Sequence, residues 1–184
     1  MYLTRHGQTM FNVIFGETKQ DPGIEDPPLT ELGFEQAAAL AEQCAELDIH
    51  RIISSPYTRA LETARMVANR LDIPVTVEPD VRERTAYVCD IGAVTSILAA
   101  DWPHLDFDHL DEVWWNREEE TIPQFHDRCS AFRARMAASE DWQHTAIVTH
   151  WGFVRSMTGK RVGNAELVRC DPNEPHPPLD TTWP

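Results

Sequence analysis

Lysine is nearly absent from this sequence. The chain of 184 residues has only Lys19 and Lys160, and arginine supplies its other basic residues. The formal net charge is −14, whereas proteins that hold a nucleic-acid backbone do so with clustered Lys and Arg. We therefore expect no nucleic-acid partner. Any site for an anionic ligand must be local and built from arginine, within an acidic exterior.

Paired cysteines and long apolar runs are absent as well. The chain's 4 cysteines lie far apart and include no Cys-x-x-Cys pair: Cys44, Cys89, Cys129 and Cys170. This pattern favours free thiols in a reducing compartment, so we expect a cytoplasmic protein. No stretch approaches the roughly 20 apolar residues of a membrane span, and no charged-then-apolar leader opens the chain. We expect neither a membrane partner nor a signal peptide.

The chain begins close to its first predicted strand. Only Met1 to Thr4 precede Arg5, whereas a typical strand has about five or six residues. Either this strand is short or the natural start lies upstream of Met1.

Apolar residues alternate between strand-like and helix-like spacing along most of the chain. Strands are predicted before Arg5 and at 51–54, 74–77, 145–149 and 166–170. Helices are predicted after an N-cap at Thr30 and at 58–71, 92–100 and 121–138, with a short one after His150. In the helix after Thr30, apolar residues recur at helical spacing and should form its buried face: Leu32, Ala37, Leu40, Ala41, Cys44 and Leu47. Residues 12–28 are predicted to be a loop. This order predicts an α/β fold, a three-layer α/β/α sandwich with a mostly parallel, doubly wound sheet.

The last part of the chain differs in composition. Residues 171–184 are rich in proline and are predicted to be an extended tail. We therefore predict one domain over residues 1–170, followed by a Pro-rich tail at 171–184.

Three predicted strand ends carry residues suited to phosphate chemistry. Arg5 and His6 follow the first strand, and His150 follows the strand at 145–149. Ser55-Pro56 leads from another strand end to Arg59, in the first turn of the next helix. The carboxyl ends of parallel strands meet at one edge of a sheet, so these side chains should converge. A neutral imidazole there could attack phosphorus while arginines neutralise the phosphoryl oxygens.

Four segments, in order and across most of the chain, resemble the histidine phosphatase superfamily, in its phosphoglycerate-mutase-like branch (branch 1). They are Leu3-Thr4-Arg5-His6-Gly7-Gln8-Thr9 with Asn12, Asp26-Pro27-Pro28-Leu29-Thr30 with Gly33, Ser54-Ser55-Pro56 with Thr58-Arg59-Ala60, and Val148-Thr149-His150 with Gly152 and Arg155. The resemblance implies a metal-independent enzyme without a cofactor, which acts on a small phosphomonoester through a phosphohistidine.

The resemblance also implies roles for individual residues. His6 would be phosphorylated, His150 would donate to the phosphoryl oxygens, and the phosphate would be held by Arg5, Asn12 and Arg59. Glu83 lies where the family has its proton donor, just beyond the strand at 74–77. A carboxyl with a pKa near 4.3 is a poor acid at neutral pH, but burial and a nearby phosphate should raise the pKa. The same group would then activate water to hydrolyse the phosphohistidine.

Two reactions share this intermediate. A mutase returns the phosphoryl group to a rearranged substrate and excludes water, whereas a phosphatase admits water. Mutases of the family carry a longer insert and Glu-Arg-His-Tyr-Gly at the acid position, where this chain has Glu83-Arg84-Thr85-Ala86-Tyr87. We therefore predict a phosphomonoesterase, with phosphoglycerate mutase as the alternative. A non-catalytic binding or scaffold module is a further alternative, which the complete residue set disfavours. The substrate and oligomeric state remain open.

The segment at 89–115 is predicted to form a lid that selects the substrate. We interpret its acidic residues as a solvated face and its tryptophans as core or lid packing; these are Asp106, Asp108, Asp111 and Glu112, and Trp102, Trp114 and Trp115.

Two other phosphatase signatures occur without their usual context. Cys129 and Arg135 have the spacing of thiol phosphatases, but they lie within a predicted helix and no Gly-rich loop separates them. Asp106-Phe107-Asp108 is similar to the aspartate pair of magnesium-dependent phosphatases, but no apolar strand precedes it. The remaining histidines lack a spacing such as His-x-x-x-His, so we predict no metal site.

Overall fold

The computed structural model describes residues 1–179 and residue 182. Its sheet has 5 strands in the order β3-β2-β4-β1-β5. β1 (Tyr2–Arg5), β2 (Arg51–Ser54), β3 (Val75–Val77) and β4 (Thr145–Thr149) are parallel, and β5 (Leu167–Arg169) runs antiparallel to β1. The prediction of a mostly parallel sheet is confirmed.

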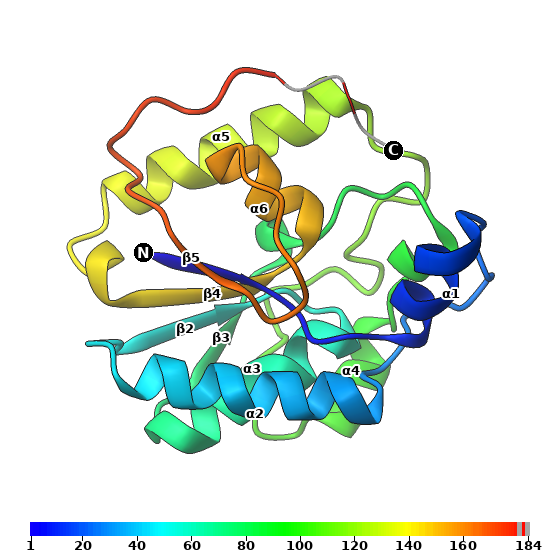
Figure 1. Ribbon diagram of the computed structural model, residues 1–184, viewed down its shortest axis with the longest axis horizontal. Coiled ribbons are helices and arrows are strands. Elements are labelled where there is room, and N and C mark those ends of the chain that lie inside the picture. Colours follow the sequence, from blue (N-terminus) through cyan, green and yellow to red (C-terminus); the bar gives the residue numbers. More distant parts are fainter. Residues whose placement is uncertain (180–181, 183–184) are drawn as a thin grey trace.

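Helices cover both faces of the sheet (Figure 1). α2 (Glu31–Ala45) and α3 (Thr58–Leu71) pack on one face, and α5 (Ile122–Ala137) and α6 (Trp151–Thr158) pack on the other. Successive strand residues point to opposite faces, so Ile52 and Ala146 join the core with α2 and α3 while Ile53 and Ile147 join the core with α5 and α6. The three-layer α/β/α sandwich is confirmed.

The first long helix begins where its N-cap predicts. The Thr30 hydroxyl accepts a hydrogen bond from the Gly33 amide at 3.0 Å, which satisfies one of the free N–H groups of the first turn. The prediction that Leu32 lies on the buried face is wrong, because its side chain is 46% exposed. Gly33 lies one helical turn before Ala37 on the same face of α2, so the buried stripe begins at Gly33 instead.

The prediction of an unbroken loop at 12–28 is also wrong. α1 spans Met10–Thr18 and lies beyond the end of the sheet (Figure 1). Thr9 and Asn12 form a reciprocal capping box, in which the Asn12 side chain accepts from the Thr9 amide at 3.0 Å. Such boxes usually have Glu or Gln at this position, which is why the sequence pattern did not reveal it. The helix ends at Lys19, whose backbone is left-handed with φ 58°.

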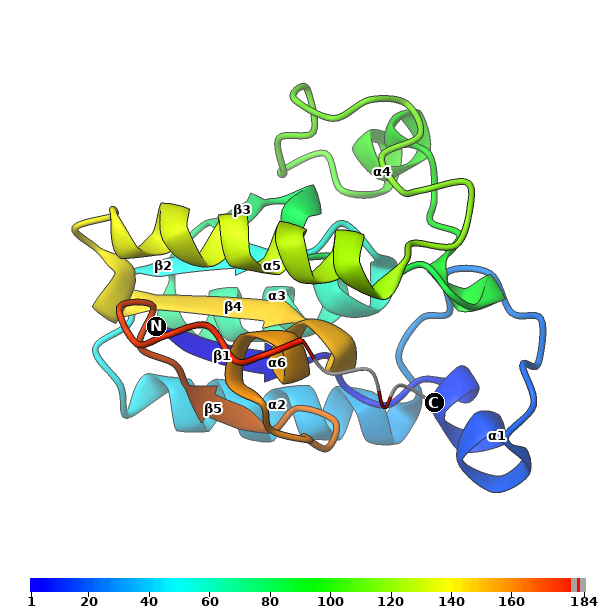
Figure 2. The ribbon, with the colours of Figure 1, turned by 90° about the horizontal axis from the view of Figure 1, so that it is seen from above.

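The segment between β3 and α5 is mostly irregular. It holds two short 3₁₀ turns (Pro79–Val81 and Val88–Asp90) and α4 (Thr95–Asp101), which lies beyond the β3 edge of the sheet (Figure 2). Trp102 and Trp114 are buried in a cluster with Tyr57 and Leu61. The interpretation of these tryptophans as packing residues is confirmed.

The described part of the tail contains no helix or strand and packs against the domain. The buried Arg133 of α5 donates to the Asp171 carbonyl at 2.5 Å and to the Glu174 carbonyl at 2.9 Å. The boundary at residue 170 stays a prediction. Within the described residues, no helix has the length and apolarity that crossing a bilayer requires.

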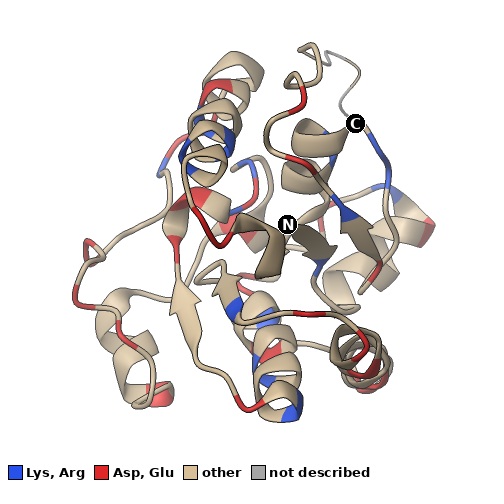
Figure 3. Ribbon diagram, turned by 90° about the vertical axis from the view of Figure 1, so that its left-hand side faces the viewer, with Lys and Arg blue, Asp and Glu red and all other residues tan. Residues whose placement is uncertain are grey.

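Charges of both signs interleave over the end of the molecule that faces the viewer in Figure 3. The cysteines are free, as expected, and their side chains are buried. Cys129 lies inside the core and Arg135 pairs with Glu78 and Asp80 on the surface. The two residues therefore form no thiol-phosphatase site.

Two glycines bring the loop after β1 against the first turn of α2. A Cβ on Gly33 would lie 2.2 Å from the Gln8 carbonyl oxygen, and one on Gly7 would lie 2.4 Å from the Gly33 carbonyl oxygen. The Gln8 carbonyl also accepts from the Thr30 amide at 2.8 Å. The shape of this loop thus depends on the absence of side chains at both positions.

We expect Gly33→Ala to lower the free energy of unfolding by about 1–3 kcal/mol, because the new methyl group must displace the loop. Urea denaturation measures this change. Gly16→Ala is the matched control, since a Cβ at that position in α1 has no described atom within 4 Å. That variant should gain up to about 1 kcal/mol from helix propensity. Equal effects of the two substitutions would contradict the packing argument.

Candidate active site

The carboxyl ends of β1 and β4 lie side by side and present two histidines. Arg5 pairs with Thr149 in the parallel register. The pairing continues one residue further, because the His6 amide donates to the Thr149 carbonyl at 2.9 Å. The ring centroids of His6 and His150 are 5.2 Å apart. The structure thus brings together the two histidines that sequence analysis placed at strand ends.

His6 is held in one protonation state and one orientation. Its Nδ1 lies 2.7 Å from the Gly7 carbonyl oxygen, and a carbonyl can only accept, so Nδ1 carries the proton and Nε2 keeps its lone pair. Burial lowers the pKa of His6 well below its ordinary value, and the charges of Arg59 and Arg5 lower it further. His6 is therefore neutral at neutral pH, as a nucleophile must be.

His150 lies behind His6 and is fully buried. Its Nε2 is 2.8 Å from the Ser55 hydroxyl oxygen, while its Nδ1 has no hydrogen-bond partner among the described residues. Burial, followed by the charge of Arg59, lowers the pKa of His150. In the sequence, Ser55 stands out only as part of a strand end, and no pattern there predicts this contact.

Arg59 projects from the first turn of α3 and is almost fully buried. Its guanidinium donates to the Cys89 carbonyl at 2.7 Å and to Asp90 Oδ1 at 3.2 Å, and it lies 3.8 Å from Asp26 Oδ1. It also stacks 4.3 Å from the centroid of the Tyr57 ring. Two carboxylates therefore hold this cation in place, and neither was predicted from the sequence to do so.

Arg5 is less fully engaged than Arg59. Burial lowers its pKa to about 10 and the charge of Glu83 opposes this shift, so Arg5 stays cationic at neutral pH. Its Nε is buried without a hydrogen-bond partner among the described residues. An unpaired buried donor is costly, and an anion bound at this position would satisfy it.

Glu83 is held by two backbone amides. Its carboxylate oxygens accept from the Arg84 amide and from the Gly152 amide in the first turn of α6, each at 2.9 Å. Burial and the nearby Asp90 carboxylate raise the pKa of Glu83. A carboxyl with a raised pKa exchanges protons closer to neutral pH.

Arg128 of α5 fixes the backbone that carries Glu83. It donates to the carbonyls of Asp80 at 2.7 Å, Arg82 at 3.0 Å and Glu83 at 3.2 Å. It also forms a bidentate pair with Glu120, at 2.9 and 2.6 Å. This buried pair positions the loop after β3 without reaching the cavity.

The amide oxygen of Asn12 accepts hydrogen bonds, whereas its amide nitrogen has no hydrogen-bond partner among the described residues. The oxygen accepts from the Thr9 amide at 3.0 Å and from Asn164 Nδ2 at 3.1 Å. Both partners are donors, so they determine which end of the Asn12 amide is the oxygen. Asn164 is a further residue that sequence analysis did not identify.

A cavity of about 650 Å³ joins these groups. We call the five predicted residues that line it the cradle: Arg5, His6, Asn12, Arg59 and Glu83. The sixth, His150, does not line the cavity and contacts it through His6. The volume of the cavity lies within the usual range for small-molecule sites, about 300–1,000 Å³.

The prediction that residues 89–115 form the lid is wrong. Of this segment, only Cys89 and Asp90 line the cavity. Its tryptophans pack around Tyr57 instead. Its acidic residues are exposed away from the cavity, as a solvated face: Asp106, Asp108, Asp111 and Glu112. Residues of α1 and Tyr87 line the cavity in its place.

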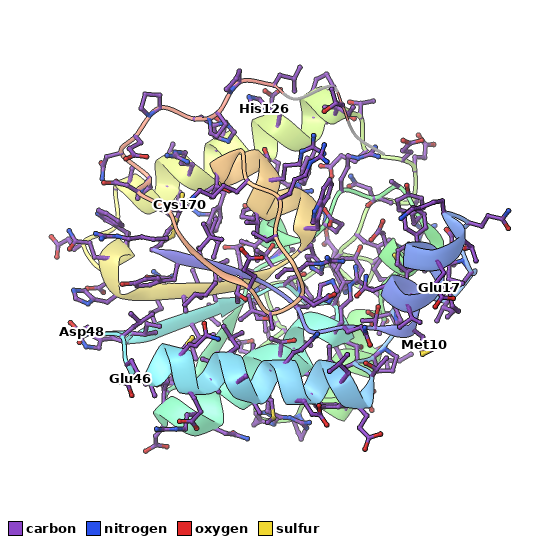
Figure 4. All side chains as sticks on the ribbon, in the orientation of Figure 1. Met10, Glu17, Glu46, Asp48, His126 and Cys170 are labelled. Atoms are coloured by element: carbon purple, nitrogen blue, oxygen red, sulfur yellow. The ribbon has the colours of Figure 1, made fainter. Side chains whose placement is uncertain are left out.

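One group of candidate metal ligands lies elsewhere. The ligand atoms of Asp48, His50 and His144 all lie within 4.8 Å of one another. Sequence spacing could not show this group, because the fold brings residues 50 and 144 together. In Figure 4, Asp48 and Met10 of α1 are at opposite ends of the molecule. The group is thus separate from the cavity, for which the absence of a metal stays a prediction.

The chain belongs to the histidine phosphatase superfamily (branch 1), whose family profile matches residues 1–169. Among curated relatives, the probable phosphoglycerate mutase GpmB of Yersinia pestis is 32% identical over 97 residues, which are 53% of this chain and 43% of that protein. The match therefore covers less than half the length of the relative.

Solved structures of the same fold include phosphatases. A mycobacterial glucosyl-3-phosphoglycerate phosphatase solved with VO3 is 25% identical with a TM-score of 0.64, covering 91% of this chain and 88% of its own. A putative α-ribazole-5′-phosphate phosphatase from Escherichia coli, 22% identical with a TM-score of 0.62, covers 90% of this chain and 86% of its own and shares the fold. Proteins similar to this chain are thus named both as phosphatases and as phosphoglycerate mutases.

Because His6 and His150 are buried in their neutral forms, the free energy of unfolding should depend on pH. The unfolded chain takes up protons near pH 6.5, whereas folded His6 and His150 do so only at lower pH. The unfolded state then binds more protons, so stability falls as the pH drops below about 6.5, by up to about 1.4 kcal/mol per pH unit for each histidine.

Urea denaturation between pH 7.5 and 5.0 measures this slope. His6→Asn should make it shallower, whereas His104→Asn, at an exposed position, should leave it unchanged. A slope that is identical in wild type and His6→Asn would show that His6 is not buried in its neutral form.

Proposed function

We propose that this protein is a metal-independent phosphomonoesterase that forms a phosphohistidine on His6 and acts on a small phosphorylated metabolite. The observation that carries the proposal is the state of His6. Its Nδ1–H is bound by the Gly7 carbonyl, its Nε2 has no hydrogen-bond partner among the described residues, and it lines the same cavity as Arg5 and Arg59. This arrangement suits attack on phosphorus between cationic groups.

In the first step, His6 Nε2 attacks phosphorus and the bond to the ester oxygen breaks. Glu83 gives its proton to the departing alkoxide. Arg5 Nε, Asn12 Nδ2 and the Arg59 guanidinium bind the phosphoryl oxygens, whose charge is spread over them in the transition state. The Gly7 carbonyl stabilises the positive ring that forms, through its hydrogen bond to Nδ1.

The His150 ring lies next to the His6 ring and is itself held by Ser55. We assign the Ser55 hydroxyl as the donor to His150 Nε2, which places the ring proton on Nδ1. That N–H has no partner among the described residues, but His150 does not line the cavity. We therefore assign His150 as a residue that positions the His6 ring, which lies next to it, and not as a donor to a phosphoryl oxygen. In the second step, Glu83 takes a proton from water, the water oxygen bonds to phosphorus, and the bond to His6 breaks to release phosphate.

The cavity favours a phosphatase over a phosphoglycerate mutase. Phosphoglycerate carries a carboxylate besides its phosphate, and that group needs a cation of its own. Outside the cradle, the basic residues that line the cavity are Arg84 and Lys19, whose ammonium donates to the Gly16 carbonyl at 3.1 Å. Arg84 is bound to the Glu119 carboxylate at 2.9 Å and to the Glu120 carbonyl at 3.0 Å. The mutase alternative rests on the partial likeness to GpmB.

We expect His6→Asn to reduce hydrolysis of phenyl phosphate by at least about 1,000-fold, because the nucleophile is removed. Wild-type protein, quenched rapidly in alkali after mixing with a ³²P-labelled ester, should carry acid-labile label on His6. His104→Asn is the matched control and should keep both turnover and label. Undiminished turnover in His6→Asn would refute the proposal.

An interconversion assay separates the two reactions of the family. With 3-phosphoglycerate and its bisphosphorylated primer, a phosphatase releases orthophosphate and forms no 2-phosphoglycerate. Rapid primer-dependent interconversion would identify a mutase instead.

We expect Glu83→Gln to slow hydrolysis of an alkyl phosphate by about 100- to 10,000-fold and that of p-nitrophenyl phosphate less, since this leaving group needs no proton. The raised pKa of Glu83 gives the sign of the pH effect. For the alkyl ester, kcat/KM should fall as the pH rises through that pKa and the acid loses its proton. A pH–rate profile from pH 4 to 9 measures this limb, which Glu83→Gln should abolish. An unchanged limb in the variant would exclude Glu83 as the acid.

A further inference from the structure

The cavity has a second part that the proposed reaction does not use. We call it the aromatic wall: Phe11 and Phe15 of α1, and Tyr87. The rings of Phe11 and Phe15 stack with centroids 5.2 Å apart and an angle of 12° between their planes. Tyr87 meets them at 5.6 and 5.1 Å. All three residues line the same cavity as the cradle.

Hydrogen bonds connect the Tyr87 side of the aromatic wall to Arg59, at the phosphate-binding end of the cavity. Asp90 is the link, because its Oδ1 accepts from Arg59 at 3.2 Å and its Oδ2 accepts from the Tyr87 amide at 3.1 Å. Phe11 is anchored, at 8% exposure, whereas Phe15 and Tyr87 are half-buried. A ligand that reaches Arg59 with its phosphate therefore meets a preformed surface.

The chemistry of the aromatic wall selects among ligands. Aromatic faces carry negative potential, so they attract flat rings and cations and disfavour anions. Pro27, Ala86 and Trp151 add further apolar lining. The Lys19 ammonium lies 6.0 Å from the centroid of the Phe15 ring and donates to the Gly16 carbonyl at 3.1 Å.

We propose that the aromatic wall binds the alcohol portion of the substrate and that this portion is a planar aromatic or heteroaromatic group. The enzyme would then prefer such esters to phosphorylated acids and to small aliphatic phosphates. This inference rests on the proposed phosphomonoesterase function. It adds a specificity site, in which Phe15 and Tyr87 contact the leaving group while the cradle holds the phosphate.

Three phosphate esters of primary alcohols test the proposal, because they share the kind of bond that breaks: 2-(2-naphthyl)ethyl phosphate, ethyl phosphate and 3-phosphoglycerate. We expect kcat/KM for the naphthyl ester to exceed each of the others by at least about tenfold, the range that ring stacking supplies. Equal values, or a preference for 3-phosphoglycerate, would overturn the inference and leave the phosphatase function standing.

Variants locate the preference. Phe15→Ala should lower the naphthyl-to-ethyl ratio of kcat/KM by about tenfold, mainly through KM, and Phe15→Leu should give an intermediate ratio. Met10→Ala is the matched control on the same helix, because Met10 is 48% exposed and points outward (Figure 4). It should keep the wild-type ratio. A wild-type ratio in Phe15→Ala would place the preference elsewhere and refute the assignment.

Binding of non-hydrolysable phosphonates separates this inference from the proposed function. Calorimetry with 2-(2-naphthyl)ethylphosphonate and ethylphosphonate needs no turnover. Binding of the naphthyl compound at least about tenfold more tightly, and loss of that difference in Phe15→Ala, would support the aromatic wall even if no ester were hydrolysed. Equal affinities would overturn it.

Discussion

Two cationic guanidinium groups and two uncharged imidazoles share one largely buried edge of a mostly parallel sheet, and much of the remaining structure serves to keep them there. Removing a charge from water is expensive unless opposite charges or oriented dipoles replace the solvent. Asp90 and Asp26 supply that replacement for Arg59, and Glu83 supplies part of it for Arg5. The histidines avoid the penalty by staying unprotonated.

This arrangement explains why the site could be found largely from the sequence. His6 and His150 follow short apolar strands, and parallel pairing places such positions together whatever their separation along the chain. Arg59 was placed correctly because its helix begins directly after a strand end. The bounds of α3 and β2 agree with the prediction, since their apolar periodicity is strong and buried neighbours reinforce it.

The features that could not be predicted from the sequence depend on contacts between segments far apart in the chain. α1 contains β-branched and aromatic residues with low helix propensity, and it is stabilised by its capping box and by Tyr87, far along the chain. Ser55 and Asp90 have polar side chains whose partners only the fold reveals. The lid was misplaced because the whole segment at 89–115 was assigned to the cavity, whereas only Cys89 and Asp90 line it and Trp114 packs on Tyr57 at 4.7 Å.

The contact between Gly7 and Gly33 has a consequence for how the protein acquires activity. The nucleophile loop and the start of α2 lie too close for either to reach its final shape alone, so they must order as a single cooperative unit. Because β1 pairs with β4 and β5 near the other end of the chain, a chain emerging from the ribosome holds His6 in an unstructured segment until most of the sequence has been made. Fraying of the first turn of α2 would likewise loosen the loop that holds His6.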